Sequence, residues 1–145
     1  MIPYSEMGQR WEHFPHGADV GIRGVGTSLA GAFEQAALAM TAAIVDPGTV
    51  LPVTRIDINC EAPNDELLLV DWLNALIYEM AARQMLFARF SVQIGDHRLS
   101  GQAWGERIDP ARHQTAVEVK GATYTALHVA KNDDSLWYAE CVVDV

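Results

Sequence analysis

Carboxylates stand near both ends of this chain. Asp19 lies in the run His16–Gly21, and Asp144 is followed directly by Val145. If the fold brings these two segments together, the side chains of Asp19 and Asp144 and an oxygen of Val145 would form a set of hard ligands. Such ligands suit Ca²⁺ or Mg²⁺ better than Zn²⁺. The sequence therefore predicts a divalent-cation site that forms where the two ends of the chain meet.

Other motifs give weaker support for chemistry. His13 and His16 form an HxxH pair, but Pro15 opposes a helical presentation and no third strong zinc ligand lies nearby in the sequence. A structural or hydrogen-bonding role is therefore favoured for these histidines. The glycine-rich run contains no phosphate-loop motif, and the chain has no serine-nucleophile elbow. Nucleotide binding and hydrolysis through a serine nucleophile are thus poorly supported.

Two single charged residues interrupt otherwise regular patterns. Asp71 lies in the apolar segment 67–73, where it is either on the solvated side of a helix or partly buried. A partly buried carboxylate needs a cation or hydrogen-bond donors. Lys120 lies in the alternating segment 117–124, whose pattern alone favours a solvated lysine. Neither pattern by itself assigns these residues a function.

The chain is acidic, with 10 Lys and Arg against 19 Asp and Glu and a formal net charge of -9. Such a charge repels a phosphate backbone unless the basic residues are clustered, and along this sequence they are scattered singly. We therefore expect no direct, high-affinity binding of nucleic acid.

The cysteines and the hydropathy pattern indicate the compartment. Cys60 and Cys141 belong to no CxxC pair and lie in strand-like apolar patterns, which favours buried, reduced thiols and a cytoplasmic location. No stretch approaches the ~18 consecutive apolar residues that a membrane-spanning helix needs. A soluble protein without a membrane partner is the expectation.

Hydrophobic periodicity predicts two helices, over residues 29–44 after an N-cap at Thr27 or Ser28, and from about residue 65 to about Arg83. Alternation predicts strands over residues 19–25, 53–60, 87–94 and 98–103. Within residues 116–145 it predicts two further strands, separated by a polar turn at 132–135. Residues 104–113 show no periodicity and predict a long exposed loop, a kind of segment that often carries function.

This order of elements favours an α+β sandwich, with a mainly antiparallel sheet and two principal helices on one face. No linker or internal repeat divides the chain, so residues 1–145 are predicted to form a single domain. The alternative is that residues 53–103 form a subdomain inserted into the rest.

Five motifs together resemble the archease family. They occupy residues 16–24, 67–74, 105–113, 118–124 and 142–145, in the family's order and with suitable spacing over almost the whole chain. Any one of these motifs alone is weak, whereas the five in sequence are specific.

The resemblance implies a non-catalytic accessory protein. Archeases assist the tRNA-splicing ligase RtcB, which joins RNA ends with GTP and manganese, by promoting guanylylation of the ligase and its multiple turnover. On this resemblance Asp19 and Asp144 match metal-binding aspartates, with Val145 adding a main-chain oxygen and calcium the first candidate for the divalent metal. Asp71, Lys120 and His16 match positions associated with activation of the partner.

Two positions depart from the family's pattern. The family usually has Thr where this chain has Gly17, and a residue other than glycine where it has Gly121. The missing hydroxyl at position 17 is expected to loosen the loop beside the metal motif. The carboxylates themselves are unchanged.

Two other classes of function stay open on the sequence. One is a chaperone-like or metal-binding module that serves another protein partner. The other is an enzyme that uses Asp19 and Asp144 as acid and base, although the sequence reveals no substrate pocket.

Overall fold

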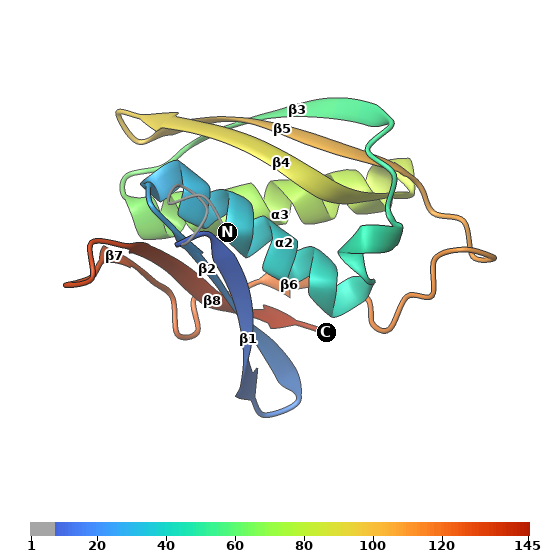
Figure 1. Cartoon of the computed structure of the whole chain (residues 1–145), viewed down its shortest axis with the longest axis horizontal. Coiled ribbons are helices and arrows are strands. Elements are labelled where there is room, and N and C mark those ends of the chain that lie inside the picture. The colour runs from blue at the N-terminus through green and yellow to red at the C-terminus, as the bar shows by residue number, and fades with distance from the viewer. Residues whose placement is uncertain (1–7) are drawn as a thin grey trace, which may run out of the picture.

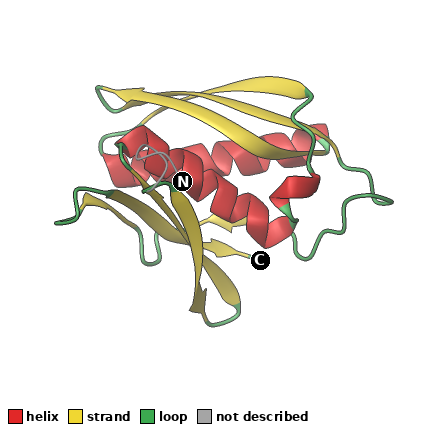
Figure 2. Cartoon of the chain, in the orientation of Figure 1, coloured by secondary structure: helices red, strands yellow, loops and turns green. Residues whose placement is uncertain are grey.

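Two antiparallel sheets enclose a layer of two helices (Figure 1 and Figure 2). The computed structural model describes residues 8–145. The first sheet has the strand order β1-β2-β8-β6, with β7 also paired to β8, and the second has the order β3-β5-β4. The strands are β1 (Arg10–His16), β2 (Asp19–Gly26), β3 (Thr54–Glu61), β4 (Met85–Gly95), β5 (Arg98–Arg107), β6 (Gly121–Ala122), β7 (His128–Lys131) and β8 (Trp137–Asp144). The helices are α2 (Leu29–Ile44) and α3 (Asp65–Arg83), and a 3-10 turn, η1, covers Pro47–Thr49.

Both helices begin at side chains that cap their first turns. The Ser28 hydroxyl accepts a hydrogen bond from the Gly31 N–H at 3.0 Å, and the Asn64 side-chain oxygen accepts one from the Leu67 N–H at 2.9 Å. Two acidic residues in the first turn of α3 add a favourable interaction with the helix dipole. The two helices expected from hydrophobic periodicity are confirmed.

Helix α2 packs closely against β2 because both contact surfaces lack large side chains. A Cβ atom at Gly24 would lie 2.1 Å from the carbonyl oxygen of Ala32, and one at Gly26 would lie 2.5 Å from the Ala32 nitrogen. A side chain at either glycine would therefore push the helix away from the sheet. This close packing positions β2, the strand that begins at Asp19.

Trp72 of α3 is fully buried and connects the helix layer with the second sheet. Its indole N–H donates a hydrogen bond to the Phe33 carbonyl in α2 at 3.2 Å, and its ring lies edge-on to Phe90 of β4. Gly101 of β5 leaves room for the indole, because a Cβ there would lie 2.5 Å from the ring. The second sheet and α3 come from residues 54–107 and share one apolar core with the rest.

The fold class is α+β, as predicted, and each sheet carries the helices on one of its faces. Within residues 8–145, neither helix is long and apolar enough to cross a bilayer. Strand β1 was not predicted, because Pro15 and exposed side chains interrupt the alternation that marks a half-buried strand.

Two predicted segments differ in the structure. Residues 104–107, expected in a loop, extend β5, because Gly105 pairs with both Thr54 of β3 and Phe87 of β4. The strand expected over 117–124 is reduced to β6, which has two residues. The segment before β6 instead passes the end of α2, where the Ala116 N–H donates to the Ile44 carbonyl at 2.7 Å.

Candidate functional site

The β1–β2 hairpin turns at the first acidic residue of the candidate site. His16 and Asp19 are paired, so only Gly17 and Ala18 form the loop between the strands. Gly17 has a φ of +59°, whereas Ala18 is not among the positive-φ residues, as in a two-residue turn with glycine at its first position. The turn uses a backbone conformation that glycine adopts without strain, and whether the missing hydroxyl loosens the loop stays a prediction.

The segment that begins at Asp19 and the last residues of the chain meet across β2 and β8. Val20 pairs with Val143, so the register continues to place Asp19 opposite Asp144, with both side chains on one face of the sheet. The Val145 N–H donates to Asp19 Oδ1 at 3.3 Å. The structure therefore contains the chain closure on which the predicted cation site depends.

His16 and Lys120 lie on either side of this closure. His16 is the exposed partner of Asp19 in the hairpin. The Lys120 N–H donates to the Asp144 carbonyl at 2.8 Å, which places its main chain beside the second aspartate. Among the six predicted site residues, the structure thus gathers these two with Asp19, Asp144 and Val145.

The donors at this closure fit a hard cation only in part. Two carboxylates and main-chain oxygen are suitable for Ca²⁺, which takes 6–8 oxygen ligands in proteins. Within residues 8–145 no three side chains of His, Cys, Asp or Glu are grouped to hold a metal. A cation here would therefore rely on main-chain oxygen and keep positions open for water or for a partner's ligands.

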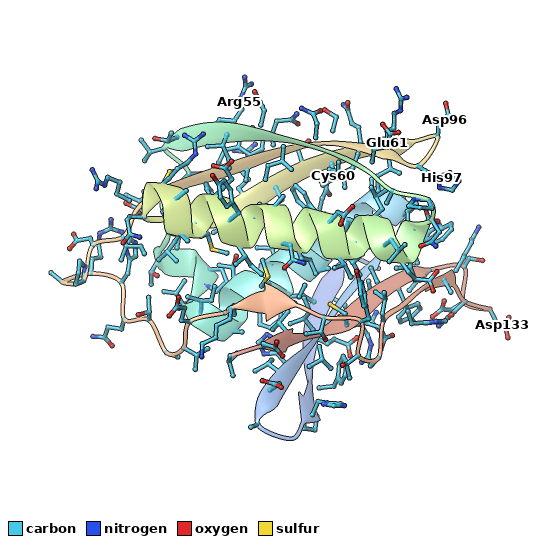
Figure 3. The ribbon with its side chains drawn as sticks, turned by 180° about the vertical axis from the view of Figure 1, so that it is seen from behind. Arg55, Cys60, Glu61, Asp96, His97 and Asp133 are labelled. Atoms are coloured by element: carbon cyan, nitrogen blue, oxygen red, sulfur yellow. The ribbon has the colours of Figure 1, made fainter. Side chains whose placement is uncertain are left out.

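Asp71 is an exposed residue of α3, on the part of the helix surface near Cys60 of β3. Its negative charge helps to raise the pKa of Cys60 to about 11, after burial of the thiol as the larger cause. Cys60 is half-buried on the side of β3 that faces α3 (Figure 3), and Asp71 itself is exposed. Of the two alternatives for Asp71, the solvated helix face is the one found.

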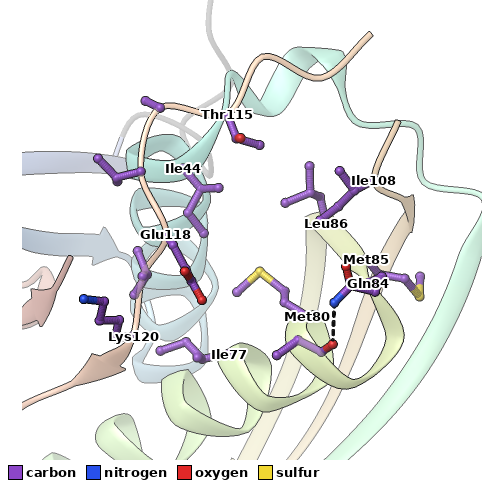
Figure 4. Close-up of a pocket in the computed structure, with 14 residues that line it drawn as sticks. Ile44, Ile77, Met80, Gln84, Met85, Leu86, Ile108, Thr115, Glu118 and Lys120 are labelled. Carbon is purple, nitrogen blue, oxygen red and sulfur yellow. Dashed lines mark hydrogen bonds between the residues drawn. The ribbon is translucent and has the colours of Figure 1, made fainter. Parts of the chain in front are cut away.

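The side chain of Lys120 is exposed at the rim of an apolar groove of about 560 Å³. The groove lies between the C-terminal halves of α2 and α3 and the crossing segment 115–120 (Figure 4). Ile44, Ile77 and Met80 form part of its floor, and Lys120 points away from them. The ammonium group is therefore available at the surface.

The histidine of the HxxH pair that packs against α2 has a hydrogen-bonding role, as predicted. His13 Nε2 donates to the Ala39 carbonyl at 2.7 Å. This bond occupies one of the two ring nitrogens and connects β1 with α2.

Sequence reasoning missed a polar network in residues 106–113. His113 is buried; its Nδ1 accepts from the Asp109 N–H at 2.9 Å, and its Nε2 donates to Glu106 at 3.1 Å. Arg112 forms an ion pair with Glu106, and the Leu51 N–H donates to the same carboxylate at 2.6 Å. The hydrogen bond from Arg112, followed by that from Leu51, lowers the pKa of Glu106 to about 2.

The sequence shows that residues 106–113 contain acidic and basic side chains, but no periodicity in it shows which of these side chains pair. The network fixes the segment after β5 against the start of β3. It therefore positions residues 108–116, part of which lines the groove next to Lys120.

Comparisons with known proteins agree over nearly the whole chain. Residues 11–145 match the model of the archease protein family (MTH1598/TM1083). Protein archease of Pyrococcus furiosus is 38% identical, with 94% of this chain and 99% of that protein covered. Protein archease of Methanosarcina acetivorans is 35% identical, with 95% and 97% covered.

Solved structures show the same fold. The solution structure of protein 1598 of Methanobacterium thermoautotrophicum has a TM-score of 0.77 at 33% identity and covers 93% of this chain and 98% of that one. The crystal structure of an archease and possible chaperone from Thermotoga maritima has a TM-score of 0.60 at 19% identity, covering 92% and 96%, and supports the fold alone.

The three-layer fold and the closure between β2 and β8 define a small α+β protein with an acidic site at the meeting of distant segments. This chain belongs to the archease family.

Proposed function

We propose that this protein is a non-catalytic activator of an RtcB-type, GTP-dependent RNA ligase in the cytoplasm. It promotes guanylylation of the ligase and multiple turnover, and it carries a carboxylate site for a divalent cation, with calcium the first candidate. The observation that carries the proposal is the closure in which Val145 donates to the Asp19 carboxylate beside Asp144. Membership of the archease family supports the choice of partner.

The acidic tip, defined as Asp19, Asp144 and Val145, suits contact with a metal- and nucleotide-containing site on a partner. A divalent cation held here would supply positive charge to phosphate oxygens and would have open positions for them. Asp144 is exposed, so its carboxylate is free to enter a cleft. The net charge of -9 fits a division of labour in which the ligase, and not this protein, holds most of the RNA backbone.

The three other predicted residues have separate parts in this proposal. His16 borders the acidic tip through its pairing with Asp19, and Lys120 places a positive charge near Asp144 that can meet a phosphate. Asp71, on the exposed side of α3, acts as a second docking contact. Because it is not one of the ligands of the acidic tip, its loss should weaken binding of the ligase more than the rate within the complex.

The test measures guanylylated ligase and multiple-turnover RNA joining with limiting ligase. The variant Asp144→Ala is compared with Asp133→Ala, a matched change in the exposed turn at the other end of β8. We expect Asp144→Ala to lose tenfold or more of the stimulation and Asp133→Ala to keep it, with both variants folded by circular dichroism. Undiminished stimulation by folded Asp144→Ala would overturn the proposal.

Cation binding is tested on the same pair of variants. Calorimetric titration with Ca²⁺, and with Mg²⁺ and Mn²⁺ in parallel, should show binding by the natural chain and by Asp133→Ala but not by Asp144→Ala. Equal binding by all three proteins would remove the acidic tip as the metal site.

The apolar groove favours a second candidate, a chaperone-like module for another protein. Met80 and Met85 line it, and their flexible side chains adapt to varied apolar partners. Capture of partners from a native extract separates the two functions. Recovery of an RNA ligase supports the activator. Recovery of unrelated proteins supports the chaperone if the variant Met80→Glu no longer captures them.

A further inference from the structure

The solvent face of the second sheet carries an aromatic ring between two arginines. Trp104 of the central strand β5 pairs with Arg55 of β3 on one side and with Arg89 of β4 on the other. The Arg89 guanidinium lies over the Trp104 ring, with its carbon 5.2 Å from the ring centroid. Figure 3 shows Arg55 extending from this face into solvent.

A β-bulge creates this arrangement. Phe87 pairs with Gly105, but the next pair is Arg89 with Trp104, so Ala88 is skipped in the register. Without the bulge, Ala88 would stand opposite Trp104 and Arg89 would face the other side of the sheet. The extra residue therefore directs an exposed arginine to the half-buried aromatic ring.

The rows that follow along the same face are polar. Asp57, Gln102 and Ser91 form the second row, and Asn59, Ser100 and Gln93 form the third. Glu61 and Arg98 stand in the fourth row, opposite Gly95. All six residues of the last two rows line an open hollow of about 690 Å³ at this end of the sheet.

The fold thus gathers basic residues that are scattered along the sequence. Within these four rows, three arginines (55, 89 and 98) and two carboxylates (57 and 61) give a local net charge of +1 on a chain of net charge -9, and Glu106, next on the same side of β5, is paired with Arg112. Arg55 pairs with Asp57 and Arg98 with Glu61, each at 3.4 Å, and all four side chains are more than half exposed. Such surface ion pairs contribute little, so the arginines can exchange them for another anion.

We propose that this solvent face of β3, β4 and β5, here called the Trp104 face, binds single-stranded nucleic acid. One base takes the place of the Arg89 guanidinium over the Trp104 ring. Arg55 and the displaced Arg89 meet the flanking phosphates, and the amide and hydroxyl rows bond the following bases. Stacking platforms flanked by positive charge are the usual means of binding single strands. The acidic remainder of the molecule keeps the affinity low, with a Kd of about 1–100 μM.

The chemistry of the Trp104 face favours a nucleic acid over a protein. Trp104 is the only apolar side chain in the four rows, whereas the centre of a protein interface is usually richer in apolar area. An A-form duplex hides its base faces and would leave the aromatic ring without a stacking partner. The inference concerns the isolated protein and does not rest on the proposed ligase partner.

The test is fluorescence anisotropy of the isolated protein with a labelled 12-nucleotide RNA, the DNA of the same sequence, and the RNA duplex at low salt. We expect binding to the single strands and at least tenfold weaker binding to the duplex. Trp104→Leu should weaken binding of the single strand about tenfold, and Trp104→Phe should restore most of it. Arg55→Gln with Arg89→Gln should weaken binding and lower the salt slope by about 1.4.

The matched control is Arg10→Gln, which removes an exposed arginine from β1 in the other sheet and should leave binding unchanged. Thermal melting of every variant shows whether it is folded. Any of three results would overturn the inference. The protein does not bind the single strand, it binds the duplex equally well, or Trp104→Leu and Trp104→Phe both bind with the affinity of the natural chain. A further result would also overturn it: the natural chain binds no single strand, and changing Trp104 abolishes binding of the ligase. The Trp104 face would then be a protein-docking surface.

Discussion

The side-chain amide of Asn74 in α3 makes two hydrogen bonds with the main chain of Ala122 in β6. The Ala122 N–H donates to Asn74 Oδ1 at 2.9 Å, and Asn74 Nδ2 donates to the Ala122 carbonyl at 3.4 Å. Strand β6 has only two residues and pairs with Val143 and Asp144 of β8. Asn74 thus connects the helix layer to the strand that adjoins the acidic tip.

We predict that Asn74→Ala lowers the free energy of unfolding by about 1–2 kcal/mol, because it removes both hydrogen bonds. It should also reduce stimulation of the ligase, since Lys120 precedes the strand that Asn74 holds. Urea unfolding and the guanylylation assay measure the two effects. Asn132→Ala, in the exposed turn before β8, is the control and should change stability by less than about 0.5 kcal/mol.

Gly17→Ala should destabilise the protein by about 1 kcal/mol, because alanine resists the positive φ of the turn before Asp19. Gly17→Thr, which introduces the residue usual in the family, should cost at least as much in this chain. Gly95→Ala provides the comparison, since Gly95 also has open space around it but no positive φ. Equal urea midpoints for Gly17→Ala and Gly95→Ala would contradict the assigned turn.

Glu106 should stabilise the fold when the pH is above the ordinary pKa of a glutamate, and this stabilisation should be lost in acid. Its folded pKa of about 2 lies below the ordinary value of 4.5, so its contribution is complete above about pH 5 and declines as the pH falls toward 2. Urea unfolding should therefore show the natural chain more stable than Glu106→Gln at pH 6, with the difference shrinking toward pH 2. Glu118→Gln, the same change at an exposed residue, should show no such trend.

The thiols should react slowly in the folded protein. Burial and the charge of Asp71 raise the pKa of Cys60 to about 11, and burial raises that of Cys141 to about 12. At pH 8 the reactive thiolate of Cys60 is then roughly 100-fold or more scarcer than in an ordinary cysteine. Asp71→Asn should speed labelling of Cys60 but not of Cys141, as resolved by peptide mass spectrometry. An unchanged Cys60 rate would place Asp71 away from β3.

Local signals in the sequence were sufficient for the helices and most strands. Ser28 and Asn64 cap the helices through neighbours three residues away, so their roles depend on nearby sequence alone. The prediction that Asp19 and Asp144 meet came from the positions of the two carboxylates and from the family motifs that contain them, and the pairing of Val20 with Val143 agrees with it. Whether the site binds a metal stays a prediction.

Features that depend on distant partners could not be predicted. Residues 104–107 extend β5 only because β3 and β4 flank them, and no local pattern marks that pairing. The division into two sheets and the arginines around Trp104 follow from the register of strands far apart in the sequence. Likewise, the proximity of Asp71 to Cys60 depends on how α3 lies against β3.

Strand β8 follows every other element along the chain, yet it lies within the first sheet, paired with β2, β6 and β7. During synthesis on the ribosome, β2 must therefore wait for a partner about 120 residues downstream, with the hydrogen-bonding groups of one edge unpaired. Contacts at such separation slow folding and prolong exposure to aggregation. A nascent chain interrupted before residue 137 should thus be recognised by chaperones and proteases, because the acidic tip forms only after β8 has been synthesised.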